Sequence, residues 1–212
     1  MDQSAEYRNK LEFFGRITAS ISHELNNVFS IVNELNGVVE DMIEIAGPGN
    51  AVDPHRLESV NGRISAQLSR GNSIIKKMNR FAHTIDEPLC HFDAAGVIDN
   101  FVSIYRRLAD LRHIRINFAD DGGFKIFGSP FGLQFVIYRC LEVLINHLPE
   151  NSTIRISFTP DNEISISAEG VTVRPEDEII AELKHAAASV GFEAVFNQNE
   201  TNSEFIVHII NN

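Results

Sequence analysis

Apolar residues recur every seven positions along the first part of the chain. One series is made of Phe14, Ile21, Val28, Leu35 and Met42, and a second, three positions later, of Ile17, Ile31, Val38 and Ile45. This spacing predicts a long helix with one continuous apolar seam. Glu24 is the one interruption of the second series. The helix is expected to end at Gly47-Pro48-Gly49, because this tripeptide cannot continue it.

A second heptad pattern follows Asp53-Pro54, a pair typical of a capped helix start. Its two series are Leu57, Ile64, Gly71, Met78 and Ile85, and Val60, Gln67, Ile74 and Phe81. The two helices are expected to form a hairpin over residues 1–87. Because neither helix can cover the other's wide apolar face, we expect two hairpins to pair as a four-helix bundle in a homodimer.

The heptad pattern breaks near Glu87-Pro88, where we expect a second domain, residues 88–212, to begin. Helical periods cover residues 94–112, 130–148 and 176–189. Strand-like patterns cover residues 113–118, 153–158, 163–167, 193–196 and 204–210. The order predicts an α+β fold in which a helical hairpin precedes an α/β sandwich.

The chain of 212 residues carries a formal charge of −11, from 29 acidic and 18 basic side chains. This excess disfavours nucleic acid or an anionic membrane as a partner, and an acidic substrate would need a local basic patch. No stretch approaches the roughly 18 apolar residues of a membrane span. The two cysteines, Cys90 and Cys140, and the lack of a secretion signal favour a cytoplasmic protein.

Candidate chemistry lies on the first helix, at Ser22-His23-Glu24-Leu25-Asn26-Asn27. His23 lies about 200° around the helix from Ile21, so its ring is expected to point away from the seam. Asn27 shares that face one turn later. A neutral imidazole is a competent nucleophile toward phosphorus, and Glu24 is placed to accept a ring proton. The alternative is an ordinary surface histidine.

Four segments in order resemble two-component sensor histidine kinases. They are FGRITASISHELNNVFSIV, KKMNRFAHTIDEP, SPFGLQFVIYRCLEVLINHLPENSTIRISF and EISISAEGVTV. The HELNN element is similar to the family's H-box. By that resemblance His23 is the phosphorylated residue, Glu24 the general base, and Asn27 the residue that orients water for phosphatase action. The family often has proline after the last position, where this chain has Val28.

The second domain departs from the family pattern. The asparagines that hold magnesium and nucleotide in the family correspond to Arg139 and Val143. Ala168-Glu169-Gly170-Val171-Thr172 stands where the family has its adenine-reading aspartate and two glycines. The stretch from Val173 to Leu183 is too short for the family's lid and holds no glycine. We therefore expect a degenerate ATPase-like domain with no ATP use and no cofactor of its own.

The leading hypothesis is a histidine phosphotransferase that receives a phosphoryl group on His23 from a receiver-domain aspartate and passes it on. The receiver of a response regulator would supply magnesium. Candidate docking contacts are Phe14, Ala19, Val28, Met78 and Phe81. For the four at heptad positions, Phe14, Val28, Met78 and Phe81, the bundle core is the favoured interpretation. Two other functions stay open. One is a non-catalytic dimeric regulator that binds a kinase or response regulator, and the other is a receiver phosphatase.

Overall fold

The computed structural model describes residues 3–86, 88–119, 124–161, 163–198 and 202–209. Chain contacts divide it into two compact units, one of Thr18–Asn79 and one of Met1–Ile17 with Arg80–Asn212. The boundary expected from the sequence falls at Glu87, which lies outside the described residues. The order of elements confirms the predicted α+β class, with a helical region followed by an α/β sheet domain.

Two long helices, α1 (Gln3–Ala46) and α2 (Pro54–His83), agree with the predicted hairpin. In the Thr18–Asn79 unit the buried seam follows the heptads, with Ile21, Val28, Leu35, Val60 and Ile74 all at most 8% exposed. At Gly71 the absence of a side chain lets Val28 pack closely, because a Cβ at Gly71 would lie only 3.3 Å from a methyl carbon of Val28. This close approach sets the register of the two antiparallel helices.

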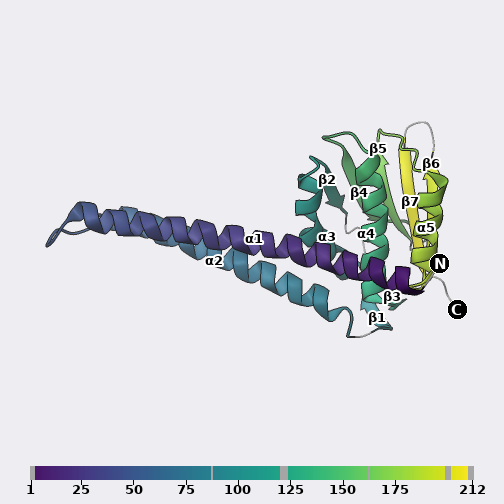
Figure 1. The fold of residues 1–212 in the computed structure, drawn as a ribbon, viewed down its shortest axis with the longest axis horizontal. Helices are drawn as coiled ribbons and strands as arrows, with labels where there is room; N and C mark the ends of the chain where they lie inside the picture. The colour runs from purple at the N-terminus through teal and green to yellow at the C-terminus, as the bar shows by residue number, and fades with distance from the viewer. Residues whose placement is uncertain (1–2, 87, 120–123, 162, 199–201, 210–212) are drawn as a thin grey trace. The chain divides into compact units, whose positions relative to one another are not determined.

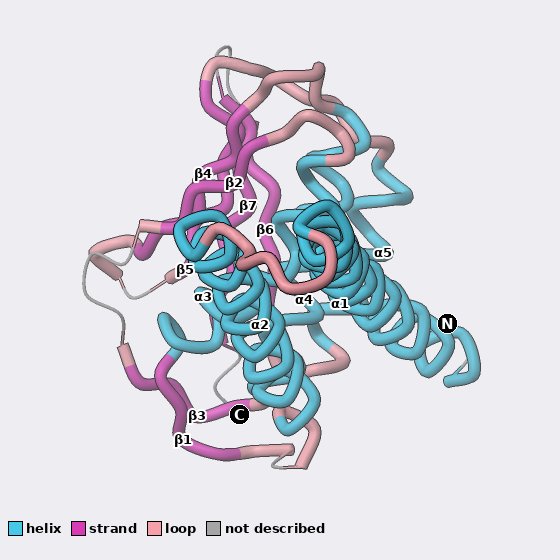
Figure 2. The backbone as a smooth tube through the Cα atoms, turned by 90° about the vertical axis from the view of Figure 1, so that its left-hand side faces the viewer, coloured by secondary structure: helices cyan, strands magenta, loops and turns pink. Residues whose placement is uncertain are grey.

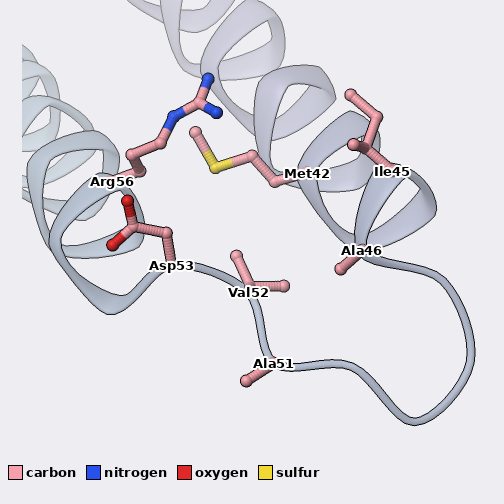
Figure 3. Close-up of a pocket in the computed structure, with 7 residues that line it drawn as sticks. All are labelled: Met42, Ile45, Ala46, Ala51, Val52, Asp53 and Arg56. Atoms are coloured by element: carbon pink, nitrogen blue, oxygen red, sulfur yellow. The ribbon is translucent and has the colours of Figure 1, made fainter.

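The turn of the hairpin begins where the sequence predicts. Gly47 has a φ of 72°, a left-handed conformation that glycine adopts without strain. Asp53 Oδ1 accepts a hydrogen bond of 3.0 Å from the His55 amide and so caps α2. Figure 3 shows Met42 and Arg56 on opposite sides of a shallow pocket of about 190 Å³ at this turn.

The sheet has five strands in the order β2-β4-β5-β7-β6. They are β2 (Arg115–Phe118), β4 (Thr153–Phe158), β5 (Ile164–Glu169), β6 (Phe192–Gln198) and β7 (Asn202–Ile209). Only β2 and β4 pair in parallel; the other neighbours are antiparallel. Three helices pack on this sheet, α3 (Ala94–Asp110), α4 (Pro130–His147) and α5 (Asp177–Ala188), with α4 between the other two (Figure 1).

The sequence analysis missed two short strands, β1 (Cys90–Asp93) and β3 (Lys125–Gly128). They pair with each other as a separate antiparallel ribbon, visible at the lower left of Figure 2. Each pairs with a partner about 35 residues away along the chain, so the pairing has no local signal.

A fully buried phenylalanine of α1, Phe13, belongs to the core of the larger unit. Its ring centroid lies 4.7 to 6.0 Å from five other aromatic rings, those of Phe81, Phe101, Phe131, Phe135 and Tyr138. These rings come from α1, α2, α3 and α4. The heptad pattern selected Phe14 instead, which is only half-buried and stacks on Phe81 at 5.4 Å.

We expect Phe13→Ala to lower the free energy of unfolding by about 3–5 kcal/mol, since it leaves a cavity among rings that cannot collapse. The matched control is Phe127→Ala, because Phe127 is 55% exposed on β3. Its cost should stay below about 1 kcal/mol. Urea unfolding of both variants measures the loss in free energy of unfolding, and equal losses would contradict the role of Phe13.

Candidate functional site

His23 and Asn27 are both exposed on α1, within the Thr18–Asn79 unit. They stand one turn apart on an unbroken helix, so the valine at position 28 continues α1 without a break. The seam residues Ile21 and Val28 are only 3% and 1% exposed. Because the seam is held by α2, the helical period turns the His23 ring outward. An imidazole in that position is open to a large reaction partner.

Glu24 is half-buried next to the seam, as its interruption of the heptad predicts. In the described part of the chain no hydrogen bond joins its carboxylate to the His23 ring. The two side chains are thus apart in this structure, and the role of Glu24 as acceptor of a ring proton stays a prediction. The physical reason is that consecutive helical residues point about 100° apart. Only a change of rotamer would bring the carboxylate to the ring.

The candidate docking residues around His23 divide by burial. Val28 is 1% exposed and Phe81 is fully buried, so neither offers surface to a partner, and the docking interpretation is wrong for both. Phe14 and Met78 are half-buried, while Ala19 is exposed. The small Ala19 side chain, one turn before His23, leaves access to the imidazole.

The residues that correspond to the magnesium asparagines of histidine kinases lie on α4. Arg139 forms an ion pair with Glu182 of α5 at 3.7 Å, as expected for a salt-bridged helix residue. Val143 is 6% exposed and part of the core. Magnesium prefers oxygen ligands in octahedral geometry, and neither a guanidinium nor an isopropyl group supplies one. These two residues do not fit the metal of a kinase nucleotide site.

The segment that replaces the adenine-reading turn follows the sheet. Ala168 is fully buried and pairs with Ile154 and Ser203 in the neighbouring strands. Gly170 then takes a φ of 71°, and α5 begins seven residues later at Asp177. The small apolar side chain at position 168 has no acceptor for an exocyclic amine.

A second cleft, of about 240 Å³, borders α4 in the larger unit, where Arg16, Tyr138, Arg139, Glu142 and His147 are among its lining residues. Arg16 donates to the Tyr138 hydroxyl at 2.9 Å and pairs with Glu142. Glu142 also accepts a 2.6 Å bond from a buried tyrosine of α3, Tyr105. Burial and then the Glu142 carboxylate raise the pKa of Tyr105, so it stays protonated as a donor.

Burial works against the charge of Arg16, but the Glu142 carboxylate and the Tyr138 hydroxyl together outweigh it and raise the pKa of the guanidinium. No sequence pattern indicates this network, because Arg16 lies 122 and 126 residues from its two partners. The Arg16, Tyr138 and Glu142 side chains that line the cleft are thus paired with one another. The network fastens the start of α1 to α4.

Among the described residues, no three His, Cys, Asp or Glu side chains converge as a metal site would require. None of the helices they form combines the length and the apolar character needed to cross a membrane.

No family model matches the chain, and neither does any curated protein sequence. Solved structures with a similar chain course include histidine kinases. One is from Burkholderia phymatum STM815, with a TM-score of 0.49 and 12% identity over 95% of this chain and 99% of that chain. Another is the Acinetobacter baumannii histidine kinase AdeS, with a TM-score of 0.47 and 13% identity over 90% of this chain and 98% of that one.

A third similar structure is described as a bacterial phosphotransferase. Its TM-score is 0.45 and its identity 10%, over 92% of this chain and 95% of that chain. What these neighbours share with this chain is the fold, a helical region followed by an α/β sheet domain.

Proposed function

We propose that the protein is a phosphorelay histidine phosphotransferase that accepts a phosphoryl group on His23 from the aspartate of a response-regulator receiver domain. The observation that carries this proposal is the exposed His23 imidazole one turn before Asn27, on a helix whose H-box-like sequence is HELNN. A solvent-facing histidine that no other side chain of the described unit engages is free to meet a phosphate held by another protein.

The reaction needs little machinery from this chain. A ring nitrogen of His23 attacks phosphorus in line, and a nitrogen–phosphorus bond forms as the bond to the aspartate oxygen breaks. The electron pair returns to the aspartate carboxylate, and the proton on the second ring nitrogen passes to Glu24 or to water. The receiver supplies magnesium to neutralise the phosphoryl oxygens. Positioning is what this protein contributes. The reverse transfer passes the group to a second receiver.

Glu24 and Asn27 have secondary roles in this proposal. A rotamer change brings the Glu24 carboxylate to the ring, where it accepts the proton and raises the basicity of the attacking nitrogen. Asn27 can orient a water molecule, which favours loss of phosphate from a docked receiver and has no part in attack by the imidazole.

ATP is excluded as the phosphoryl source in this proposal. Where a nucleotide-bound magnesium would need oxygen ligands, the chain has the Arg139–Glu182 ion pair and the buried Val143. The buried Ala168 replaces the adenine-reading carboxylate. The phosphate must then come from a phosphorylated protein.

A homodimer is part of the proposal, because the hairpin has an apolar face that α1 and α2 do not cover. Phe29 is 56% exposed, Leu68 49% and Ile75 40%. Going around each helix from the seam in the order of the sequence, Phe29 on α1 and Leu68 and Ile75 on α2 come next after the seam residues. Because the two helices are antiparallel, these three side chains lie on the same side of the hairpin. Phe29 lies about 120° around α1 from His23. A second hairpin can cover this face while His23 stays exposed.

His23→Ala should abolish labelling by a phosphorylated receiver and leave unfolding unchanged, because an exposed helix position tolerates alanine. Glu24→Gln should slow transfer by about 10²-fold or more, the usual contribution of a general base. The Asn27→Ala variant should be labelled at nearly the rate of the unaltered protein and should lose any phosphatase activity. Rapid-quench labelling with a phosphorylated receiver panel measures all three.

Other outcomes of that assay favour the remaining functions. Label that persists in His23→Ala, or receiver binding without any transfer, would indicate a non-catalytic regulator. Release of free phosphate without a protein label, lost in Asn27→Ala, would indicate a receiver phosphatase.

Millimolar Mg-ATP should leave the melting temperature unchanged, because a ligand that does not bind the native state cannot stabilise it. Arg139→Asn alone should not create binding, since Val143 and Ala168 remain. A magnesium-dependent rise in melting temperature with ATP, measured by calorimetry, would contradict the degenerate character of the domain.

Leu68→Asp should weaken the dimer by about 100-fold, or about 3 kcal/mol, because it buries a carboxylate in the apolar face. Ser69→Asp is the matched control, since Ser69 is exposed and points about 100° away. Sedimentation of both variants at several concentrations gives the comparison. A monomeric unaltered protein at micromolar concentration would refute the dimer.

A further inference from the structure

The two helices of the hairpin carry opposite charge. Residues 18–46 of α1 hold five acidic side chains and no lysine or arginine. Residues 54–83 of α2 hold six basic side chains and only one acidic one, Glu58. The basic residues are Arg56, Arg63, Arg70, Lys76, Lys77 and Arg80. In a chain with a net charge of −11, α2 is a local exception.

Four of these cations, Arg56, Arg63, Arg70 and Lys77, repeat every seven residues. A seven-residue step drifts only about 20° on a helix, so the four lie along one side of α2 as a basic stripe. Arg56, Arg63 and Arg70 are exposed and Lys77 is half-buried. Among the described residues no carboxylate pairs with Arg63 or Arg70. Their charge is therefore presented to solvent.

The basic stripe lies on the same side of the hairpin as His23. Around each helix, His23 on α1 and Arg70 on α2 lie on the opposite side of the seam from the apolar face. Both therefore point to the other side of the hairpin from Phe29 and Leu68. The contact of Val28 with Gly71 sets the levels along the helices. Counting from it, Lys77 stands near the level of His23 and Arg70 near that of Phe29. The stripe thus reaches the level of the imidazole at Lys77, and Arg70 follows about 10 Å farther along the helix axis.

This arrangement favours a compact acidic partner over a polyanion. Successive stripe residues are about 10 Å apart, since the rise is about 1.5 Å per residue, whereas duplex DNA carries a charge about every 1.7 Å. Glu34 and Asp41 of α1 lie on the same side farther along and would repel a continuous anion. A protein that holds aspartyl phosphate with magnesium presents a small cluster of carboxylates, which fits one or two of the arginines.

We propose that the Arg56, Arg63, Arg70 and Lys77 stripe is the surface that captures the acidic phosphorylation face of a receiver domain and steers it to His23. The inference rests on the proposed function, because that function names the partner. Charges of this kind raise the association rate and leave the chemical step unchanged. Their effect is screened over about 8 Å at physiological salt.

The test compares Arg70→Glu with Lys76→Glu. Both variants change the charge by the same amount on exposed positions of one helix, but Lys76 points about 120° away from Arg70. Fluorescence anisotropy measures binding of each receiver of a purified panel, with beryllofluoride as the aspartyl-phosphate mimic. Labelling of His23 by the same phosphorylated receivers is measured in parallel.

Arg70→Glu should weaken binding by about 10-fold at low salt relative to Lys76→Glu, and the difference should vanish at high salt. The labelling rate at saturating receiver should be equal in both. Equal binding of the two variants, or no receiver bound by the unaltered protein, overturns the inference. Competition by a short DNA duplex or by anionic vesicles also overturns it, because the stripe would then serve another class of partner.

The two proposals fail separately. If binding depends on Arg70 and no label reaches His23, the docking surface stands and the phosphotransferase function falls. If His23 is labelled and Arg70→Glu behaves like Lys76→Glu, the function stands and the stripe has no part in docking.

Discussion

The buried seam between α1 and α2 is the constraint on which the site depends. Ile21, Val28 and Leu35 face α2, and the period of the helix then decides what every other residue of α1 can face. His23 and Asn27 are held in solvent without any contact of their own. The same period leaves Phe29 and Leu68 on another flank. One packing interaction thus separates the surface proposed for phosphoryl transfer from the surface proposed for self-association.

The second structural theme is how α1 begins. Phe13 lies within a cluster of aromatic rings, and Arg16 pairs with Glu142 on α4. The first turns of α1 therefore belong to the core of the α/β unit. On α4 of the same unit, Arg139 forms a salt bridge with Glu182 and Val143 is buried in the core. In our account this domain anchors the helix that carries His23, and phosphate comes from outside.

Sequence reasoning predicted the elements whose signals are local. Both long helices, their glycine and aspartate boundaries and the outward position of His23 follow from heptads and turn residues. It missed Phe13 because the strict seven-residue repeat selects its neighbour Phe14, and it missed Arg16 because its partners are far along the chain. The strand order and the parallel β2–β4 pair are nonlocal. Among the described residues no hydrogen bond joins His23 and Glu24, because adjacent helical side chains diverge.

The central claim is that His23 itself carries phosphate derived from a receiver. The most direct measurement is peptide mass spectrometry after brief incubation with a phosphorylated receiver, combined with the acid and base stability of the modification. We predict an acid-labile, base-stable phosphoryl group on the peptide that contains His23. Finding that peptide unmodified while the receiver keeps its phosphate would contradict the account.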